Sequence, residues 1–364
     1  MAQTPLLMIP GPVPVRDDVL AALAEPVRSH TSTQNAATMR RVQDGIRSCV
    51  GGGPATRVHV IAGSGTLAME AAVVNHARPG DRVVVCSNGY FGDRFEEIAE
   101  AQGMPVTAVR SEWGGRVEPE AVVAACAGGP PPALVTVTHV DTSTGALADA
   151  AAIAAACRDS GAVLVLDGVC ATGGVAEAMD GWGYDVVLTG AQKALGVPPG
   201  LAILAVSERA RSRRATLGRI TAYYADLARW DPILDDPVRY FSTHPTSLLR
   251  ALEVSLDAIA AEGLPARFAR HQRLAERLRG AMAGLGFEPL TDAAALAPTL
   301  SVLAVPSGVD DTRLRARMAD AGVVVAGGLG PFAGRAVRIG HMGGIGDAQV
   351  DATVAAARAA LAQA

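Results

Sequence analysis

The chain has 364 residues, of which 49% are hydrophobic and 19% charged, with a net charge of −4 and a mean hydropathy of +0.25. This composition is typical of a globular protein with enough apolar material for a large and a smaller domain, and it excludes a disordered chain. The negative net charge and the lack of a basic run argue against nucleic-acid or anionic-membrane binding, so we expect neither partner.

Cysteine usage and the N-terminal segment bear on the compartment. The five cysteines form no C-x-x-C pair and no cluster with histidine, which favours a reducing compartment and argues against a metal site. The first fifteen residues lack a basic segment and are broken by prolines, which is unlike a signal peptide. Apolar runs elsewhere are interrupted within about ten residues, too few to span a bilayer. We therefore predict a cytoplasmic protein.

The N-terminal half predicts an extended arm followed by an α/β domain. Residues 1–14 contain several prolines and should run extended. From about residue 57 to 207, short β-branched runs alternate with alanine-rich helical stretches. The runs are apolar throughout, which indicates a mainly parallel sheet covered by helices on both faces. The expected strands are 57–63, 81–87, 105–110, 133–140, 162–167, 184–190 and 201–207.

The pattern changes at the break formed by Gly263 and Pro265. A long amphipathic helix is expected at about 263–284, and further helices at 311–321 and 347–362. Between them lie fewer apolar strands, at 301–305, 322–327 and 336–342. We therefore predict a large domain over residues 15–262 and a smaller α+β domain over residues 263–364.

Lys193, in the segment TGAQKALGVPPG, is the single lysine among 32 lysine and arginine residues. Arginine serves wherever a solvated charge is enough, but its guanidinium does not lose a proton to become a base or nucleophile. The retained lysine therefore favours amine chemistry at this position. The alternative is an arginine-rich composition that left one lysine by chance.

Residues that follow the strands of a parallel sheet converge at its carboxyl edge. The segment 63–66, GSGT, lies between an expected strand and helix, where N–H groups and hydroxyls form an anion site. Asp167 ends an apolar strand and needs a partner there, unless it caps a helix or turn. Lys193 follows the strand 184–190. Together they match what pyridoxal 5'-phosphate (PLP) requires for its phosphate, ring nitrogen and imine carbon.

Eight spaced segments resemble the class V PLP-dependent aminotransferases, in particular the alanine–glyoxylate and serine–pyruvate group. They are IPGPVPV, GSGT, NGYFGDR, DTSTGAL, LDGVCATGG, TGAQKALGVPPGLA, RYFSTHPTSLLRAL and VRIGHMG, and they extend over nearly the whole chain. The resemblance implies the fold type I architecture, with a large PLP-binding domain around a mainly parallel sheet and a smaller C-terminal α+β domain. It also implies a homodimer with shared active sites.

The resemblance implies a role for each matching cofactor residue. Lys193 would form the Schiff base with PLP, and Asp167 would pair with the ring nitrogen. Phe91 would stack on the ring, with Tyr90 as its alternative, and Ser143 would lie near the 3′-oxygen. The implied phosphate contacts are Ser64, Gly65, Thr66 and Gln192, together with Tyr240 and Thr243 reaching across from the neighbouring subunit.

The substrate contacts come from the same resemblance. Arg338 would bind the substrate carboxylate through a bidentate fork, with Gly11 and Ser143 beside it. The expected reaction transfers an amino group from alanine or serine to glyoxylate or pyruvate. Thr31, in SHTSTQ, occupies a position where many relatives carry arginine, which leaves the substrate specificity open.

Three other functions remain open from the sequence. An aminoethylphosphonate or pyridoxamine transaminase would share most of these residues. A cysteine desulfurase or related lyase is less favoured, because it needs a nucleophilic cysteine near the C-terminal domain and the last cysteine is Cys170. A non-catalytic nucleotide-binding protein on a Rossmann-like scaffold would use GSGT for a nucleotide and would leave Lys193 unexplained.

Overall fold

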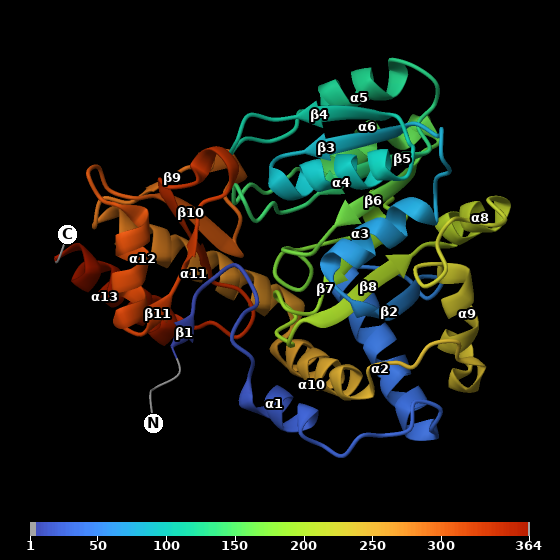
Figure 1. Ribbon diagram of the computed structural model, residues 1–364, viewed down its shortest axis with the longest axis horizontal. Coiled ribbons are helices and arrows are strands. Elements are labelled where there is room, and N and C mark those ends of the chain that lie inside the picture. Colours follow the sequence, from blue (N-terminus) through green and yellow to red (C-terminus); the bar gives the residue numbers. More distant parts are fainter. Residues whose placement is uncertain (1–4, 363–364) are drawn as a thin grey trace.

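The computed structural model describes residues 5–362, arranged around a seven-stranded sheet (Figure 1). The strand order is β2-β8-β7-β6-β5-β3-β4, and only β8 runs against its neighbours. The strands are β2 (Arg57–Gly63), β3 (Val83–Ser87), β4 (Val106–Arg110), β5 (Leu134–Thr138), β6 (Val163–Asp167), β7 (Val186–Gly190) and β8 (Gly200–Val206). The predicted mainly parallel sheet is therefore confirmed, with one antiparallel strand.

Helices cover both faces of this sheet, which explains its uninterrupted apolar strands. In β3, Val84 packs into the core on one face, whereas Val83 and Val85 pack into the core on the other. The first core includes residues of α2 (Thr33–Val50), α5 (Pro119–Ala127), α6 (Ala150–Ala156) and α10 (Thr246–Glu262). The second includes residues of α3 (Gly65–Val74), α4 (Tyr90–Ala101), α8 (Glu208–Thr216) and α9 (Leu227–Asp235).

The C-terminal part is built on a four-stranded antiparallel sheet of order β12-β13-β10-β9. Its strands are β9 (Glu288–Pro289), β10 (Leu300–Ala304), β12 (Ala326–Gly327) and β13 (Ala336–Gly340). It shares a third core with α11 (Leu264–Ala283), α12 (Asp311–Asp320) and α13 (Asp347–Leu361). The expected strand 322–327 is two short strands, β11 (Val323–Val324) and β12, which belong to different sheets.

The N-terminal segment lies against the C-terminal part. β1 (Leu6–Leu7) pairs in parallel with β11, and α1 (Asp17–Leu23) then packs against α10. Gly263, with φ of 81°, separates α10 from α11. The division into residues 1–14, 15–262 and 263–364 stays a prediction that this arrangement supports. In the described range, no helix is both long and apolar enough to cross a membrane.

Candidate active site

A cavity of about 290 Å³ lies at the carboxyl ends of β6 and β7. Eight of the predicted site residues line it, so residues from five separate sequence segments meet at one place. These eight are Gly11, Ser64, Gly65, Thr66, Phe91, Asp167, Gln192 and Lys193. The lining also contains side chains that we did not assign to the site from the sequence, among them Arg94, Thr142, Val169 and Cys170.

One end of the cavity is built for an anion. Ser64 caps the N-terminus of α3, and its hydroxyl accepts a hydrogen bond from the N–H of Leu67 at 3.4 Å. Gly65 and Thr66 form the first turn of the helix, where N–H groups lack intrahelical partners and the helix dipole is positive. Arg94 adds a guanidinium that donates to Thr66 Oγ1 at 3.4 Å. Gln192 places a side-chain amide in the lining, and the NH₂ group of an amide can donate to an anion.

Asp167 lies at the end of β6 and is 3% exposed. Its carboxylate accepts a hydrogen bond from the N–H of Val169 at 2.9 Å, but no described basic residue forms an ion pair with it. Burial raises the pKa of Asp167 to about 7, against the effect of the Val169 N–H. A buried carboxylate in this state is poised to take a cationic partner.

Lys193 follows β7 by three residues and is 9% exposed. Its Nζ donates a hydrogen bond to the carbonyl oxygen of Pro10 at 2.5 Å. Burial lowers the pKa of Lys193, and the nearby charge of Arg338 lowers it further, although Cys170 and Asp167 act in the opposite direction. The buried amine is therefore easier to deprotonate than a solvated lysine.

Only glycine fits at position 11 beside this amine. Gly11 has φ of +130°, and a Cβ there would lie 2.5 Å from Cδ and 2.9 Å from Nζ of Lys193. The N-terminal segment therefore closes against the lysine side chain at a glycine. This contact explains why Gly11 lines the cavity although it precedes the first helix.

The Ser143 hydroxyl is engaged inside the protein. Its side chain is fully buried outside the cavity lining, where Oγ donates to Asp141 Oδ1 at 2.6 Å and accepts from the N–H of Tyr90 at 3.0 Å. Asp141 also accepts from the N–H groups of Phe91 and Gly92. Ser143 therefore holds the start of α4, because Asp141 and Tyr90 use its hydroxyl. Its expected contacts with the cofactor and the substrate stay a prediction. Thr142, its neighbour, lines the cavity.

Phe91, not Tyr90, lines the cavity. Its ring is half-buried and lies 4.8 Å from the guanidinium carbon of Arg94. Tyr90 is 42% exposed, and its ring meets that of Phe91 edge to face at 5.5 Å between centroids. Of the two predicted stacking residues, the structure therefore places Phe91 where it could contact a bound ring.

Arg338 lies on β13 beside the cavity but not in its lining. It donates from Nε to the carbonyl of Gly327 at 2.7 Å and from Nη1 to that of Thr142 at 3.3 Å. Burial lowers its pKa, and no described carboxylate forms an ion pair with it. A half-buried guanidinium satisfied only by carbonyl oxygens keeps its charge available to an anionic partner.

Tyr240 and Thr243 do not reach the cavity of their own chain. Tyr240 is 48% exposed, and its ring lies 4.3 Å from that of His30. Thr243 is exposed and lines a separate surface hollow together with His30 and His244. The structure therefore separates these two residues from the other predicted cofactor contacts.

Two residues that we did not assign to the site from the sequence complete it. Asp141 is fully buried, and its position at the start of DTSTG, directly before three hydroxyl residues, was its sequence signal. Cys170 follows Asp167 by three residues, and burial raises the pKa of its thiol. The Cys170 thiol is therefore kept in its protonated form beside Lys193.

Residues 20–331 match the family model of the class-V aminotransferases. The chain belongs to this family. It is 36% identical to the soluble hydrogenase small subunit of Synechococcus sp., covering all of this chain and 94% of that protein. It is 33% identical to alanine–glyoxylate aminotransferase 1 of Saccharomyces cerevisiae, covering 93% and 91% of the two chains. The solved structure of ureidoglycine–glyoxylate aminotransferase from Bacillus subtilis superimposes with a TM-score of 0.96, at 29% identity and over 100% and 94% of the chains.

The comparisons confirm the predicted family, fold class and enzyme class. Class-V aminotransferases of this architecture are PLP-dependent enzymes, so the chain is a PLP-dependent aminotransferase. The assignment covers most of the sequence, because the family match spans the seven-stranded sheet and most of the C-terminal part. The roles of the individual cavity residues stay predictions.

Proposed function

We propose that the cavity binds PLP and transfers an amino group from a small amino acid to glyoxylate. The observation that carries the proposal is the meeting of three features in one cavity: the only lysine of the chain, a buried carboxylate that pairs with no basic side chain among residues 5–362, and the N-terminus of α3. Each of these three features is costly or unusual alone. Together they match the imine carbon, the ring nitrogen and the phosphate of one cofactor.

The cavity residues fit PLP by their chemistry. Ser64, Thr66 and the first N–H groups of α3 would bind the phosphate, aided by the side-chain NH₂ of Gln192 and the Arg94 guanidinium. Phe91 and Val169 would supply apolar contacts to the ring. Thr142, the neighbour of Ser143, would add a hydroxyl to the cavity wall.

When bound, PLP supplies a ring that withdraws electrons from the bond being broken at the substrate's α-carbon. Asp167 would stay ionised beside a cationic ring nitrogen and keep that nitrogen protonated. Lys193 would take the proton from the α-carbon at Nζ, because burial lowers the pKa of its amine. The carbonyl of Pro10 orients this amine between proton transfers. Arg338 would bind the substrate carboxylate through its guanidinium.

The choice of substrates rests on the relatives. The yeast protein is named for alanine and glyoxylate and the Bacillus protein for ureidoglycine and glyoxylate, so glyoxylate is the shared acceptor. We propose alanine or serine as the donor, since the cavity is small, and pyruvate as the weaker acceptor. We also propose a cytoplasmic homodimer in which Tyr240 and Thr243 reach the partner's phosphate site, which their exposure in the single chain allows.

The test is a donor and acceptor screen on the PLP-loaded protein. Alanine is supplied with glyoxylate, and serine and aspartate are each supplied with glyoxylate or pyruvate. The new keto acid and the glycine or alanine formed are quantified. We expect the highest kcat/KM with alanine or serine and glyoxylate, and no turnover by K193A. PLP binding without turnover for any donor would contradict the proposal. Sedimentation with and without PLP tests the dimer.

A further inference from the structure

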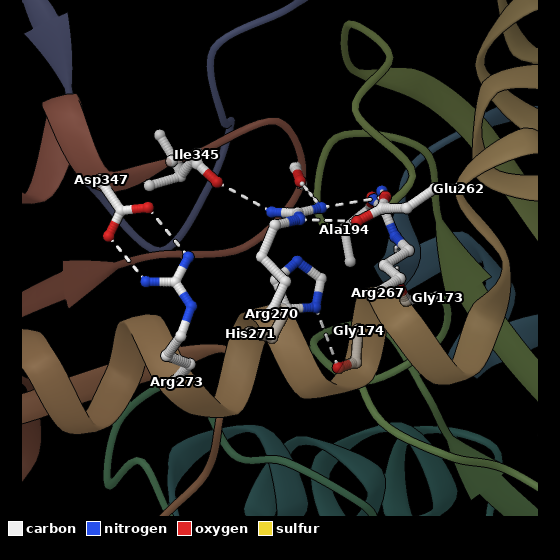
Figure 2. A network of polar contacts seen from close by, with 12 residues as sticks. Gly173, Gly174, Ala194, Glu262, Arg267, Arg270, His271, Arg273, Ile345 and Asp347 are labelled. Atoms are coloured by element: carbon white, nitrogen blue, oxygen red, sulfur yellow. Dashed lines mark hydrogen bonds and ion pairs between the residues drawn. The ribbon is translucent and has the colours of Figure 1, made fainter.

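Helix α11 places a buried arginine against the two segments that carry Asp167 and Lys193 (Figure 2). Arg267 is 6% exposed and uses all three nitrogens of its guanidinium. Nε donates to the carbonyl of Gly173 at 2.7 Å, Nη2 donates to that of Ala194 at 2.5 Å, and Nη1 pairs with Glu262 at 2.8 Å.

The two carbonyl acceptors belong to the proposed catalytic segments. Gly173 lies six residues after Asp167, in the loop that follows β6, and Ala194 directly follows Lys193. The segments also approach each other at Gly174, where a Cβ would lie 3.1 Å from the Cβ of Ala194. One guanidinium therefore connects both segments next to the point where they touch.

Neighbouring side chains of α11 extend the same contact. His271, one turn after Arg267, forms a hydrogen bond through Nδ1 with the carbonyl of Gly174 at 3.1 Å. Burial lowers the pKa of His271 to about 4, so the ring is neutral and Nδ1 is the donor. Arg270 donates to the carbonyls of Ile345 at 2.8 Å and Gly343 at 3.0 Å, in the segment that follows β13 and Arg338.

Glu262 compensates the buried charge. It accepts hydrogen bonds from both Arg267 and Arg270, and these partners lower its pKa to about 2. A buried guanidinium is stable only with such a partner, and its fixed fork sets the positions of its acceptors more narrowly than apolar contacts would. The network thus buries a guanidinium, with a partly exposed carboxylate as its partner, at a place where apolar packing would also join the two segments.

We propose that Arg267 is a positioning residue for amino transfer, which fixes the Lys193 amine relative to the Asp167 carboxylate. It acts through the carbonyls of Gly173 and Ala194 and touches neither cofactor nor substrate. The inference rests on the proposed function, because it assumes that both residues act on bound PLP. The alternative is that Arg267 only joins the C-terminal part to the large sheet.

The same helix offers a matched control. Arg273 also forms an ion pair, donating to both carboxylate oxygens of Asp347 at 2.7 and 2.9 Å, but its side chain is 54% exposed (Figure 2). It contacts neither catalytic segment. The variants R267M and R273M therefore remove the same group from one helix, and only the first releases the two carbonyls.

The experiment compares the wild type, R267M, R267K and R273M as full-length proteins. For each we measure thermal unfolding without cofactor, the PLP dissociation constant, the visible spectrum of the PLP-loaded protein, and kcat and KM with the best donor. We expect R267M to change the visible spectrum and lower kcat about 10- to 100-fold, with the donor KM within about threefold. R267K, which keeps a donor for the carbonyls, should regain part of kcat, and R273M should match the wild type.

The inference would be overturned if R267M had the visible spectrum and the kcat of the wild type and differed only by a lower unfolding temperature. If R267M does not fold, the inference is tested with R267K and with the pair H271N and H271F. Asparagine keeps a hydrogen-bond donor near the place of His271 Nδ1, whereas phenylalanine has none. Wild-type kcat and spectra in R267K and H271F would then overturn it. A wild type that binds no PLP would overturn the proposed function and this inference together, whereas active wild type beside active R267M overturns the inference alone.

Discussion

The Nζ of Lys193 donates a hydrogen bond to the carbonyl oxygen of Pro10 at 2.5 Å, although the two residues lie 183 positions apart. The N-terminal segment is therefore part of the candidate site. It pairs through β1 with β11 of the C-terminal part and places a backbone acceptor on the proposed catalytic amine. The site thus depends on three parts of the chain: the N-terminal segment, the large sheet and the C-terminal part.

The first prediction concerns Gly11. In G11A the new Cβ would overlap the Lys193 side chain, and the φ of +130° is strained for alanine. We expect kcat to fall about 100-fold and the free energy of unfolding to fall by about 1–3 kcal/mol. The control is G344A, because the nearest atom to its new Cβ, on Arg16, lies at 3.5 Å. Equal activity of G11A and G344A would show that the approach of Gly11 to Lys193 is unimportant.

The second prediction concerns the pH dependence that Asp167 gives to the cofactor-free protein. Its pKa is about 7 in the folded state against an ordinary 3.8, so the folded protein keeps a proton that the unfolded chain has lost. The stability contributed by this proton is complete below pH 4 and is lost as the pH rises through 7. D167N cannot ionise. At pH 8 it should therefore exceed the wild type in free energy of unfolding by about 1–3 kcal/mol, with no such gain at pH 4.

Denaturant unfolding of both apoproteins between pH 4 and 8 measures this difference. The same D167N substitution should lower kcat of the PLP-loaded enzyme by at least about 100-fold, since a neutral amide does not keep the ring nitrogen protonated. Parallel stability curves for D167N and wild type would contradict the account of Asp167 as a buried carboxylate without an internal partner.

The third prediction concerns Arg338. R338M removes the proposed carboxylate partner and should raise the KM for the amino donor about 30-fold or more, while the PLP dissociation constant changes little. R335M is the control, because Arg335 is exposed on the same segment and donates only to the carbonyl of Pro331. A KM for R338M equal to that of R335M would remove Arg338 from substrate binding.

The fourth prediction concerns the two aromatic residues Tyr90 and Phe91. F91L should weaken PLP binding about 3- to 10-fold through lost stacking, whereas Y90L should bind PLP as the wild type does, because Tyr90 lies outside the cavity lining. Equilibrium binding of PLP to the two apoproteins measures both constants. A larger loss of PLP affinity in Y90L than in F91L would show that Tyr90, and not Phe91, stacks on the cofactor.

Much of this site follows from the sequence because parallel strands end at a common edge. Asp167 and Lys193 each follow an apolar strand, and a unique lysine is visible without any structure. Ser143 shows the limit of this reasoning. From the sequence, a hydroxyl in DTSTG can face either the cavity or the start of α4. The orientation of Ser143 follows from the position of Asp141, which accepts hydrogen bonds from Ser143 and from the start of α4.

The role of Arg267 could not be predicted from the sequence either, because nothing in the sequence distinguishes this buried arginine from the exposed Arg273 on the same helix. Its two carbonyl acceptors lie 94 and 73 positions away, and no local pattern encodes them. The division of residues 322–327 between two sheets also depends on contacts that are distant in the sequence. Pairing of β11 with the N-terminal β1 is a tertiary contact.

The most direct test of the account is a visible absorbance titration of the purified protein with PLP, followed by alanine or serine and then glyoxylate. We predict a cofactor band that is lost on addition of the donor and restored by glyoxylate, and that does not form in K193A. A protein that shows no band at saturating PLP, or a K193A variant that shows the same band and the same cycle, would contradict the assignment of Lys193 as the catalytic amine.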